Sequence, residues 1–309
     1  MSDFNAEDYN ISRHFYSEFY QITDHDGGPL TNIYLSYADR NMPVFGTVYL
    51  FHGYGGSPVE PCLKIPMLYA LSRGFDVAAL EGAALSATYS DKKDLSNMNL
   101  ARQKYAIMRG LWFCSKNDRL CHDNKIAWGH SLSCRALSDM VAEHPFVRQY
   151  FGEVILNNPY FITPSRVEKL RNKLIKRDPS GSMWRTLVDK AATMYRIIEN
   201  QKYSIPTCLR NLAVPLPQAW QYKPENIESL AAKMSDFVTD IRMTFVLGTA
   251  DDMAEYNQNL KFYNGLKVTN KELISIDGAD HSFENAIPQY NQVAHGIIDN
   301  IYTRCEKTK

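Results

Sequence analysis

Short apolar runs separated by helix-like segments constrain the fold of this 309-residue chain more than any other feature. Six runs are apolar at nearly every position, namely residues 46–52, 75–80, 125–129, 153–158, 243–248 and 272–277. Strands that are apolar on both faces belong to a parallel sheet covered by helices. The segments between the runs, among them 61–74, 99–116 and 131–145, carry helical patterns. The alternation predicts an α/β protein with a mostly parallel central sheet and helices on both faces.

The segments before and after the six apolar runs also have patterns typical of secondary structure. Residues 15–23 and 30–38 are rich in aromatic and β-branched side chains, and they flank the sequence DHDGGP. An Asp-Gly pair between two such runs favours a tight turn, so we predict an antiparallel hairpin ahead of the parallel strands. Residues 284–305 have a helical pattern and follow the last apolar run.

The alternation is interrupted once, between residues 160 and 240. This stretch has no pattern of a buried strand, and its helix-like segments are broken by prolines. It is too long to be a loop inside a compact domain. We therefore predict a helical cap insertion at 160–240, and a core made of residues 1–159 and 241–309.

Composition and charge exclude several classes of protein. The 34 basic residues balance the 34 acidic ones, so charge indicates no nucleic-acid partner. The N-terminal residues do not resemble a signal peptide, and no apolar stretch reaches about 18 residues, so we expect a cytoplasmic protein. The six cysteines lack CxxC spacing, and no His, Asp and Glu set has the spacing of metal ligands. We therefore expect reduced thiols, no metal and no cofactor.

The segment KIAWGHSLSCRAL, residues 125–137, combines a strand pattern and a helix pattern around Ser131. A sharp turn from a strand to a helix can hold a serine oxygen clear of the backbone, where a histidine can take its proton. Such a turn requires small side chains two positions before and after the serine. Gly129 and Ser133 occupy those positions and give G-x-S-x-S in place of the commoner G-x-S-x-G.

A glycine-rich segment, HGYGGSP at residues 52–58, follows the first of the six apolar runs. Glycines let the main chain turn sharply there. The backbone N–H groups of Tyr54 and of Leu132, the residue after Ser131, are candidates for an oxyanion hole. An ordinary glycine-rich turn is the alternative.

Acidic and imidazole side chains follow the last two apolar runs. Asp251 and Asp252 come just after one of them, and His281 comes just after the other. In an open α/β sheet, a ligand site is expected at the carboxyl ends of the strands. The sequence therefore places Ser131, a carboxylate and His281 at the same edge of the sheet.

The ordered motifs HGYGG, EGAALS (81–86), GHSLS, GTADD and GADHSF resemble the α/β-hydrolase fold family, in particular its capped branch of monoacylglycerol lipases, lysophospholipases and serine aminopeptidase-like proteins. The resemblance implies that Ser131 is the nucleophile and His281 the general base. It also selects Asp251 as the orienting acid, because the family's G-x-x-D spacing runs from Gly248 to Asp251, and it leaves Asp252 as the fallback. Two segments depart from the family pattern, Ser133 in the pentad and EGAALS after the second parallel strand.

The resemblance implies a serine hydrolase that cleaves an acyl ester of a small molecule through an acyl-enzyme, either a carboxylesterase or a monoacylglycerol or lysophospholipid lipase. The same triad can serve a thioesterase, an acyltransferase or a serine peptidase, since each transfers an acyl group to water, an alcohol or an amine. A non-catalytic α/β-hydrolase that acts as a binding module is a further alternative.

The predicted cap is basic. Residues 160–235 contain thirteen Lys or Arg and only six Asp or Glu. Within it, residues 164–177 have the pattern of an amphipathic helix with a row of cations beside an apolar strip. Such a helix suits peripheral contact with an anionic lipid surface. The alternative is a helix that packs its apolar side on the core and leaves its cations in solvent.

Overall fold

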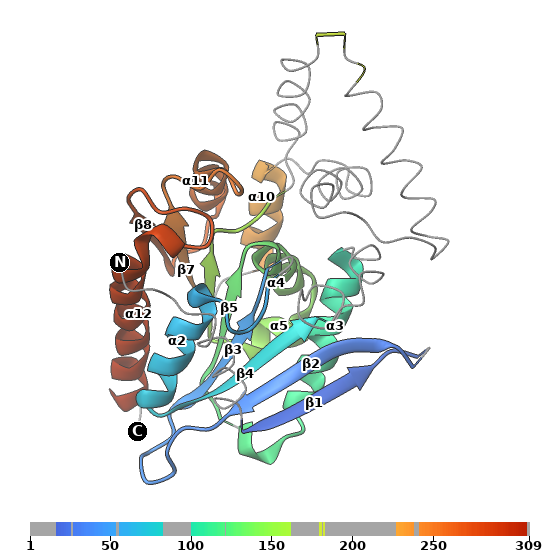
Figure 1. Cartoon of the computed structure of the whole chain (residues 1–309), viewed down its shortest axis with the longest axis vertical. Coiled ribbons are helices and arrows are strands. Elements are labelled where there is room, and N and C mark those ends of the chain that lie inside the picture. The colour runs from blue at the N-terminus through green and yellow to red at the C-terminus, as the bar shows by residue number, and fades with distance from the viewer. Residues whose placement is uncertain are drawn as a thin grey trace.

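The computed structural model describes residues 17–25, 27–53, 56–82, 100–120, 122–161, 179–180, 182, 227–237 and 241–307. Within these residues an eight-stranded sheet forms the centre of the molecule, and helices cover both of its faces (Figure 1).

The strands follow one another along the chain as β1 (Glu18–Thr23), β2 (Pro29–Ser36), β3 (Gly46–Phe51), β4 (Phe75–Gly82), β5 (Lys125–His130), β6 (Glu153–Asn157), β7 (Arg242–Gly248) and β8 (Lys271–Ile276). Across the sheet their order is β1-β2-β4-β3-β5-β6-β7-β8. The β1–β2 and β2–β4 pairs are antiparallel, and every pair from β4 to β8 is parallel. The predicted hairpin, the positions of the six strands and the mostly parallel sheet are confirmed. The last of the six strands was wrongly predicted to be buried: β8 lies at the edge of the sheet, and only its Ile276 is buried.

The helices of the described residues are α2 (Pro61–Ser72), α3 (Leu100–Cys114), α4 (Leu132–Glu143), α5 (Pro145–Tyr150), α10 (Ile227–Phe237), α11 (Tyr256–Gly265) and α12 (Ile287–Lys307), with short 3-10 turns η3 (Asp118–Leu120) and η4 (Glu284–Ala286). The sequence pattern predicted one helix at 131–145, but α4 ends at Glu143 and α5 begins at Pro145. His144 between them is extended (φ −115°, ψ 108°), because the ring of a proline disfavours helical backbone at the preceding residue.

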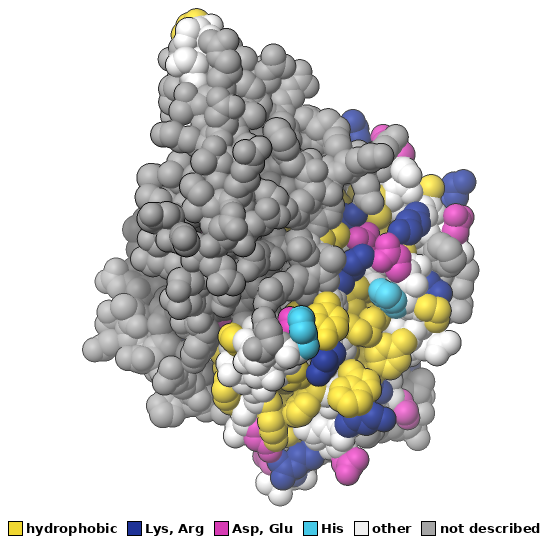
Figure 2. Space-filling model, turned by 90° about the vertical axis from the view of Figure 1, so that its right-hand side faces the viewer, with side chains coloured by type: hydrophobic (Ala, Val, Ile, Leu, Met, Phe, Trp, Pro, Cys, Tyr) yellow, Lys and Arg dark blue, Asp and Glu magenta, His cyan; other side chains and the backbone are white. Residues whose placement is uncertain are grey.

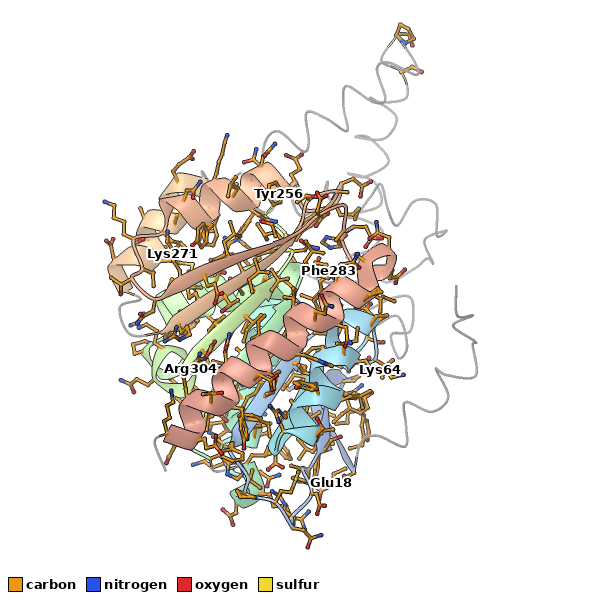
Figure 3. The ribbon with its side chains drawn as sticks, turned by 90° about the vertical axis from the view of Figure 1, so that its left-hand side faces the viewer. Glu18, Lys64, Tyr256, Lys271, Phe283 and Arg304 are labelled. Carbon is orange, nitrogen blue, oxygen red and sulfur yellow. The ribbon has the colours of Figure 1, made fainter. Side chains whose placement is uncertain are left out.

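Two apolar cores lie on opposite faces of the sheet, because successive side chains of a strand point to opposite sides. In β3, Val48 and Leu50 belong to the core beneath α2 and α12, whereas Tyr49 and Phe51 belong to the core beneath α3, α4, α10 and α11. Figure 3 shows the first face, on which α12 lies alongside α2. All six residues of β3 are buried, as the continuous apolar run predicts.

Most of the predicted cap, including residues 164–177, lies outside the described residues, and the division into core and cap stays a prediction. The helix α10, which the sequence pattern assigned to the insertion, packs against α4 and α11. Its residues Leu230, Ala231 and Met234 are buried in the same core as α4. Helix α10 therefore packs as part of the apolar core that covers this face of the sheet.

One face of the molecule carries exposed aromatic side chains. Hydrophobic side chains gather on the face shown in Figure 2, which carries the β1–β2 hairpin and α3. Trp112 and Tyr105 of α3 are 58% and 42% exposed, and Tyr20 of β1 packs on Phe113 with 4.9 Å between ring centroids.

None of the helices in the described part of the chain has the length and apolar character needed to cross a bilayer.

Candidate active site

A strained turn joins β5 to α4 at Ser131. The backbone of this serine has φ 57° and ψ −121°, a conformation that non-glycine residues rarely adopt and that costs on the order of 1–3 kcal/mol. Small neighbours are required, as predicted: a Cβ on Gly129 would lie 2.8 Å from Leu137 and 3.3 Å from the Cys134 sulfur. The turn therefore presents the Ser131 hydroxyl at the carboxyl edge of the sheet.

Ser133, which replaces the usual second glycine of the pentad, has hydrogen-bond partners of its own. This buried hydroxyl donates to the backbone carbonyl of His52 and accepts a hydrogen bond from Gln103 Nε2 at 3.0 Å. It thereby ties the start of α4 to the end of β3 and to α3. A serine in this position is accommodated because its oxygen bonds to the neighbouring chain segment.

Ser131, His281 and Asp251 form a continuous hydrogen-bonded row. His281 Nε2 lies 2.8 Å from Ser131 Oγ, and His281 Nδ1 lies 2.8 Å from Asp251 Oδ2. A carboxylate only accepts hydrogen bonds, so Nδ1 donates to it, and Nε2 of the neutral ring is left to accept from the serine hydroxyl. The three residues follow β5, β7 and β8, so the sheet brings together the residues that the motifs had placed at its edge.

The two neighbouring aspartates of the β7 loop differ in their surroundings. Asp251 is 6% exposed, and its second oxygen accepts hydrogen bonds from the backbone N–H groups of Met253 and Ala254, both at 2.7 Å. Asp252 is exposed. The carboxylate that faces the imidazole is therefore that of Asp251.

Asn158, which the sequence analysis did not single out, links the two loops that carry the acid and the histidine. Its side-chain amide donates to the backbone carbonyls of His281 (2.8 Å) and Asp280 (3.1 Å), and its oxygen accepts from the N–H of Gly248 (2.8 Å). Asn158 has φ 43°, a left-handed conformation that asparagine tolerates better than most residues. The pair of polar residues that ends the apolar run 153–158 was the only signal in the sequence.

Of the two predicted oxyanion donors, Leu132 is described and Tyr54 lies outside the described residues. Leu132 is the first residue of α4, where a backbone N–H has no partner within the helix. The flanking Gly53 packs against the serine, because a Cβ on Gly53 would lie 2.7 Å from Ser131 Cβ. His52 Nδ1 lies 2.7 Å from the carbonyl of Gly53, the next residue of this segment.

Potential metal ligands lie beside the turn at Ser131, although the spacing of such residues along the sequence had indicated no metal site. Among the described residues, Glu60, Cys62 and His130 bring a carboxylate, a thiol and an imidazole within 4.8 Å of one another. Glu60 directly precedes α2, Cys62 is the second residue of that helix, and His130 ends β5.

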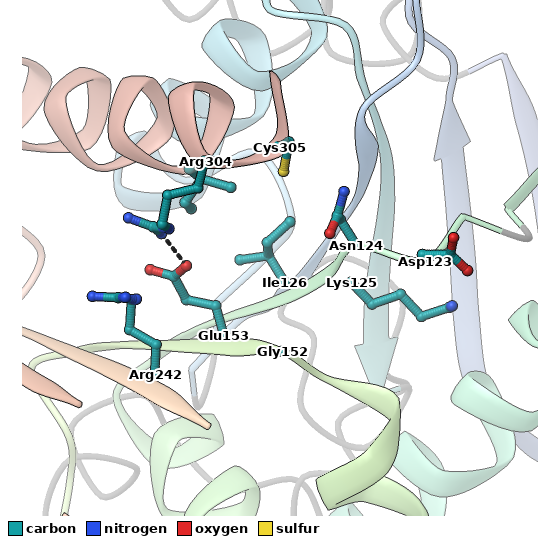
Figure 4. A pocket seen from close by; sticks show the side chains of 10 residues that line it. Asp123, Asn124, Lys125, Ile126, Gly152, Glu153, Arg242, Arg304 and Cys305 are labelled. Carbon is teal, nitrogen blue, oxygen red and sulfur yellow. Dashed lines mark hydrogen bonds and ion pairs between the residues drawn. The ribbon is translucent and has the colours of Figure 1, made fainter. Parts of the chain in front are cut away.

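A separate cavity lies at the opposite edge of the sheet (Figure 4). It has a volume of about 210 Å³ and is lined by residues at the amino ends of β5, β6 and β7 and by the end of α12. Glu153 faces Arg304 there, and burial raises the pKa of this carboxyl above its usual value. The cavity is remote from Ser131, which lies at the carboxyl edge.

Comparison with solved structures identifies the architecture. The esterase Est1E from Butyrivibrio proteoclasticus superimposes with a TM-score of 0.59 at 14% sequence identity, over 93% of this chain and 100% of that one. The esterase Pf2001 from Pyrococcus furiosus gives a TM-score of 0.57 at 14% identity over 98% and 97% of the two chains. An alpha-beta serine hydrolase homologue from Coxiella burnetii gives 0.55 at 10% identity over 91% and 96%.

This chain has the α/β-hydrolase fold. No protein-family model matches the sequence, and no curated protein matches it. In the α/β-hydrolase fold, as in other common folds, the reaction is determined by the residues of the site. The arrangement of Ser131, His281 and Asp251 therefore carries the functional argument.

Proposed function

We propose that this α/β-hydrolase fold protein is a serine hydrolase that cleaves carboxylic esters of small molecules through an acyl-enzyme on Ser131. The observation that carries the proposal is the unbroken row of two 2.8 Å hydrogen bonds from Ser131 through His281 to Asp251. A serine hydroxyl becomes a strong nucleophile when a positioned base takes its proton, and the base works best when a carboxylate fixes its tautomer.

In the first half of the reaction, Ser131 Oγ attacks the ester carbonyl while its proton passes to His281 Nε2. The resulting imidazolium is stabilised by Asp251, which stays ionised. The negative charge that develops on the carbonyl oxygen requires backbone donors, and we assign this role to the N–H groups of Leu132 and Tyr54. Collapse of the tetrahedral intermediate breaks the bond to the alcohol, which leaves with the proton from His281.

In the second half, water attacks the acyl-enzyme. His281 accepts a proton from this water, and the carboxylic acid is released as Ser131 recovers its hydrogen from the imidazolium. The reaction consumes one water per ester and needs neither a redox partner nor an added group.

We further propose a medium or long acyl chain and a substrate of the monoacylglycerol or lysophospholipid type, with residues 160–240 as the cap that selects it. The support is the series of sequence motifs that resembles the capped lipase branch. The structural neighbours are esterases and a serine hydrolase homologue, and they do not determine the acyl length for this chain.

Ester turnover by active-site variants tests the reaction. p-Nitrophenyl esters of graded acyl length serve as substrates for the wild type, Ser131→Ala, His281→Ala and the double variant. Each single change should lower kcat by about 10⁴-fold or more, and the double change should cost little beyond either one. Ser115→Ala, a change at the end of α3, serves as the matched control and should keep full turnover. Wild-type turnover by Ser131→Ala would refute the proposal.

A second panel of substrates is needed to identify the acyl donor and the acyl acceptor. Monoacylglycerol, lysophospholipid, acyl thioester and aminoacyl substrates distinguish an esterase from a thioesterase or a peptidase, and an added alcohol reveals acyl transfer. Absence of turnover on every substrate would favour the binding-module alternative.

We also propose that the basic segment 164–177 contacts anionic lipid, on the strength of its row of cations. Sedimentation with phosphatidylglycerol vesicles would compare the wild type with a variant in which Lys169, Lys173 and Lys176 are replaced by Gln. Each cation contributes on the order of 1 kcal/mol near an anionic surface, so the variant should bind markedly less. Equal and negligible binding by both proteins would leave the segment as a solvated helix.

A further inference from the structure

A compact group of three potential metal ligands lies next to the candidate active site. Glu60 is the residue that precedes α2, Cys62 is the second residue of that helix, and His130 ends β5 directly before Ser131. Glu60 Oε2 lies 3.9 Å from Cys62 Sγ and 3.8 Å from His130 Nδ1, and the three ligand atoms all lie within 4.8 Å of one another.

A hydrogen bond orients the ring of His130 toward this group. His130 Nε2 lies 3.0 Å from the backbone carbonyl of His281, and a carbonyl only accepts, so Nε2 carries the hydrogen. Nδ1 is therefore the ring nitrogen that faces the group, and it can coordinate a cation once it carries no proton. Within the described part of the chain this buried nitrogen has no hydrogen-bond partner. A histidine that donates one N–H to a backbone carbonyl and offers its other nitrogen is the usual form of a metal-binding histidine.

The surroundings of the group suit a bound cation. Cys62 is fully buried and His130 is 4% exposed, whereas the Glu60 side chain is 29% exposed and leaves a way in from solvent. The backbone of Gly56 also packs against the carboxylate, because a Cβ on Gly56 would lie 2.5 Å from Glu60 Oε1.

The main chain of Cys62 is also fixed in place. Pro66 lies one helical turn further along α2 and has no N–H, so it cannot donate to the Cys62 carbonyl. The hydroxyl of Tyr290 supplies the missing donor at 2.5 Å. Cys62 is therefore held rigidly while its sulfur faces Glu60 and His130.

We propose that Glu60, Cys62 and His130 form a zinc site, with a water molecule as the fourth ligand. A thiolate, an imidazole and a carboxylate around a tetrahedral Zn²⁺ are separated by about 3.3–3.6 Å. The two distances from Glu60, 3.8 and 3.9 Å, need only small movements, and the distance from Cys62 to His130, which is at most 4.8 Å, must shorten to the same range. On binding, the Cys62 thiol and the protonated His130 ring each release a proton to solvent, and the sulfur and Nδ1 each form a bond to Zn²⁺. No electrons are transferred, so the step needs no oxidant or reductant.

The position of the site gives the ion a structural role. Zinc would join the start of α2 to the end of β5, and through the Nε2 hydrogen bond of His130 it would hold the backbone of His281. We therefore expect zinc to stabilise the folded chain. This inference is independent of ester hydrolysis, because the three ligands take no part in the proposed reaction.

Metal analysis of the full chain, without an affinity tag, tests the site. The protein is treated with a chelator, dialysed against Zn²⁺ and analysed by mass spectrometry for bound metal. The expected content is about one zinc per chain, because each chain contributes one set of three ligands. Cys62→Ser and Glu60→Gln should each weaken binding by at least about tenfold, whereas Cys305→Ser, at the end of α12, should bind as the wild type does.

Two further measurements separate loss of a ligand from loss of the fold. Circular dichroism should be unchanged in Glu60→Gln, whose side chain is partly exposed. Co²⁺ added to the wild type should give a thiolate-to-metal charge-transfer band that Cys62→Ser lacks. Saturating zinc should raise Tm by about 5 °C in the wild type and not in the two variants. A zinc content near zero, or equal zinc affinity in Cys62→Ser and the wild type, would overturn the proposal.

Discussion

Asn158 donates its side-chain amide to the backbone carbonyl of His281 at 2.8 Å, and the same carbonyl accepts from His130 Nε2 at 3.0 Å. The backbone of the candidate general base is thus held from two sides, by the ends of β6 and β5. Because the oxygen of Asn158 also accepts from Gly248, the side chain couples the β7 loop, which carries Asp251, to the β8 loop. Asn158 is therefore a positioning residue for the pair formed by Asp251 and His281.

Replacing Asn158 by Ala should lower kcat for ester hydrolysis by about 10- to 100-fold, because small displacements of a catalytic group are costly. KM should change little, since the side chain is directed at backbone and not at the substrate. Steady-state kinetics measures both parameters.

Asn157→Ala provides the control for this change. Asn157 is equally buried, but its amide donates to the hydroxyl of Tyr290 at 2.6 Å, away from the His281 loop. This variant should lose stability and keep most of its kcat. An equal loss of kcat in both variants would mean that Asn158 acts only through stability.

Asp251→Asn should lower kcat by about 10⁴-fold, because an amide no longer holds the productive tautomer of the imidazole. Asp252→Asn should stay within a few-fold of the wild type, since this side chain is exposed. Parallel assays of the two variants on one p-nitrophenyl ester make the comparison. A larger loss in Asp252→Asn would reverse the assignment of the acid.

Ser133→Ala should lower the free energy of unfolding by about 1–3 kcal/mol, because Gln103 Nε2 would lose its buried acceptor and the carbonyl of His52 its donor. Urea denaturation measures the change. Ser133→Ala combined with Gln103→Leu should recover part of the loss, since both polar partners are then absent. No recovery in the double variant would show that the two side chains are not coupled.

Glu143 should make stability depend on pH in the acid range. Burial raises its pKa, but ion pairs with Lys104 of α3 and Lys233 of α10 outweigh this and bring the pKa from 4.5 down to about 2. A carboxyl with a lowered pKa in the folded state stabilises the protein above pH 4.5 and loses that effect as the pH falls toward 2.

The measurable consequence is a pH-dependent difference between Glu143→Gln and the wild type. The variant should be less stable by about 1 kcal/mol at pH 7, a value discounted because the side chain is about a third exposed. The difference should shrink steadily between pH 4.5 and pH 3 in denaturation experiments. Asp236→Asn, an exposed change on α10, should show no such trend. A constant difference across this range would contradict the assignment.

Strands β3 to β7 could be predicted from the sequence because each is buried on both faces and therefore reads as a continuous apolar run. The sequence pattern did not predict helix α11, for the opposite reason. Only Asn259 and Phe262 of this helix are buried, so it has too few apolar positions to show a helical period.

Within the site, Ser131, Asp251 and His281 could be identified because each follows an apolar run and belongs to a motif with known spacing. Asn158 and the Glu60, Cys62 and His130 group could not, since their contacts join segments far apart in the chain. Their proximity depends on the strand order β3-β5-β6-β7, which places the ends of these strands side by side. Strand order is not encoded in the periodicity of any single segment.

The identity of the nucleophile is tested most directly by the site of reaction with a fluorophosphonate, which phosphonylates an activated serine and releases fluoride. After labelling of the full chain, mass spectrometry of its peptides locates the adduct. We expect about one adduct per chain, on Ser131, no adduct in Ser131→Ala and strongly slowed labelling in His281→Ala. An unlabelled wild-type protein, or an adduct on any other serine, would contradict the central claim that Ser131 is the nucleophile.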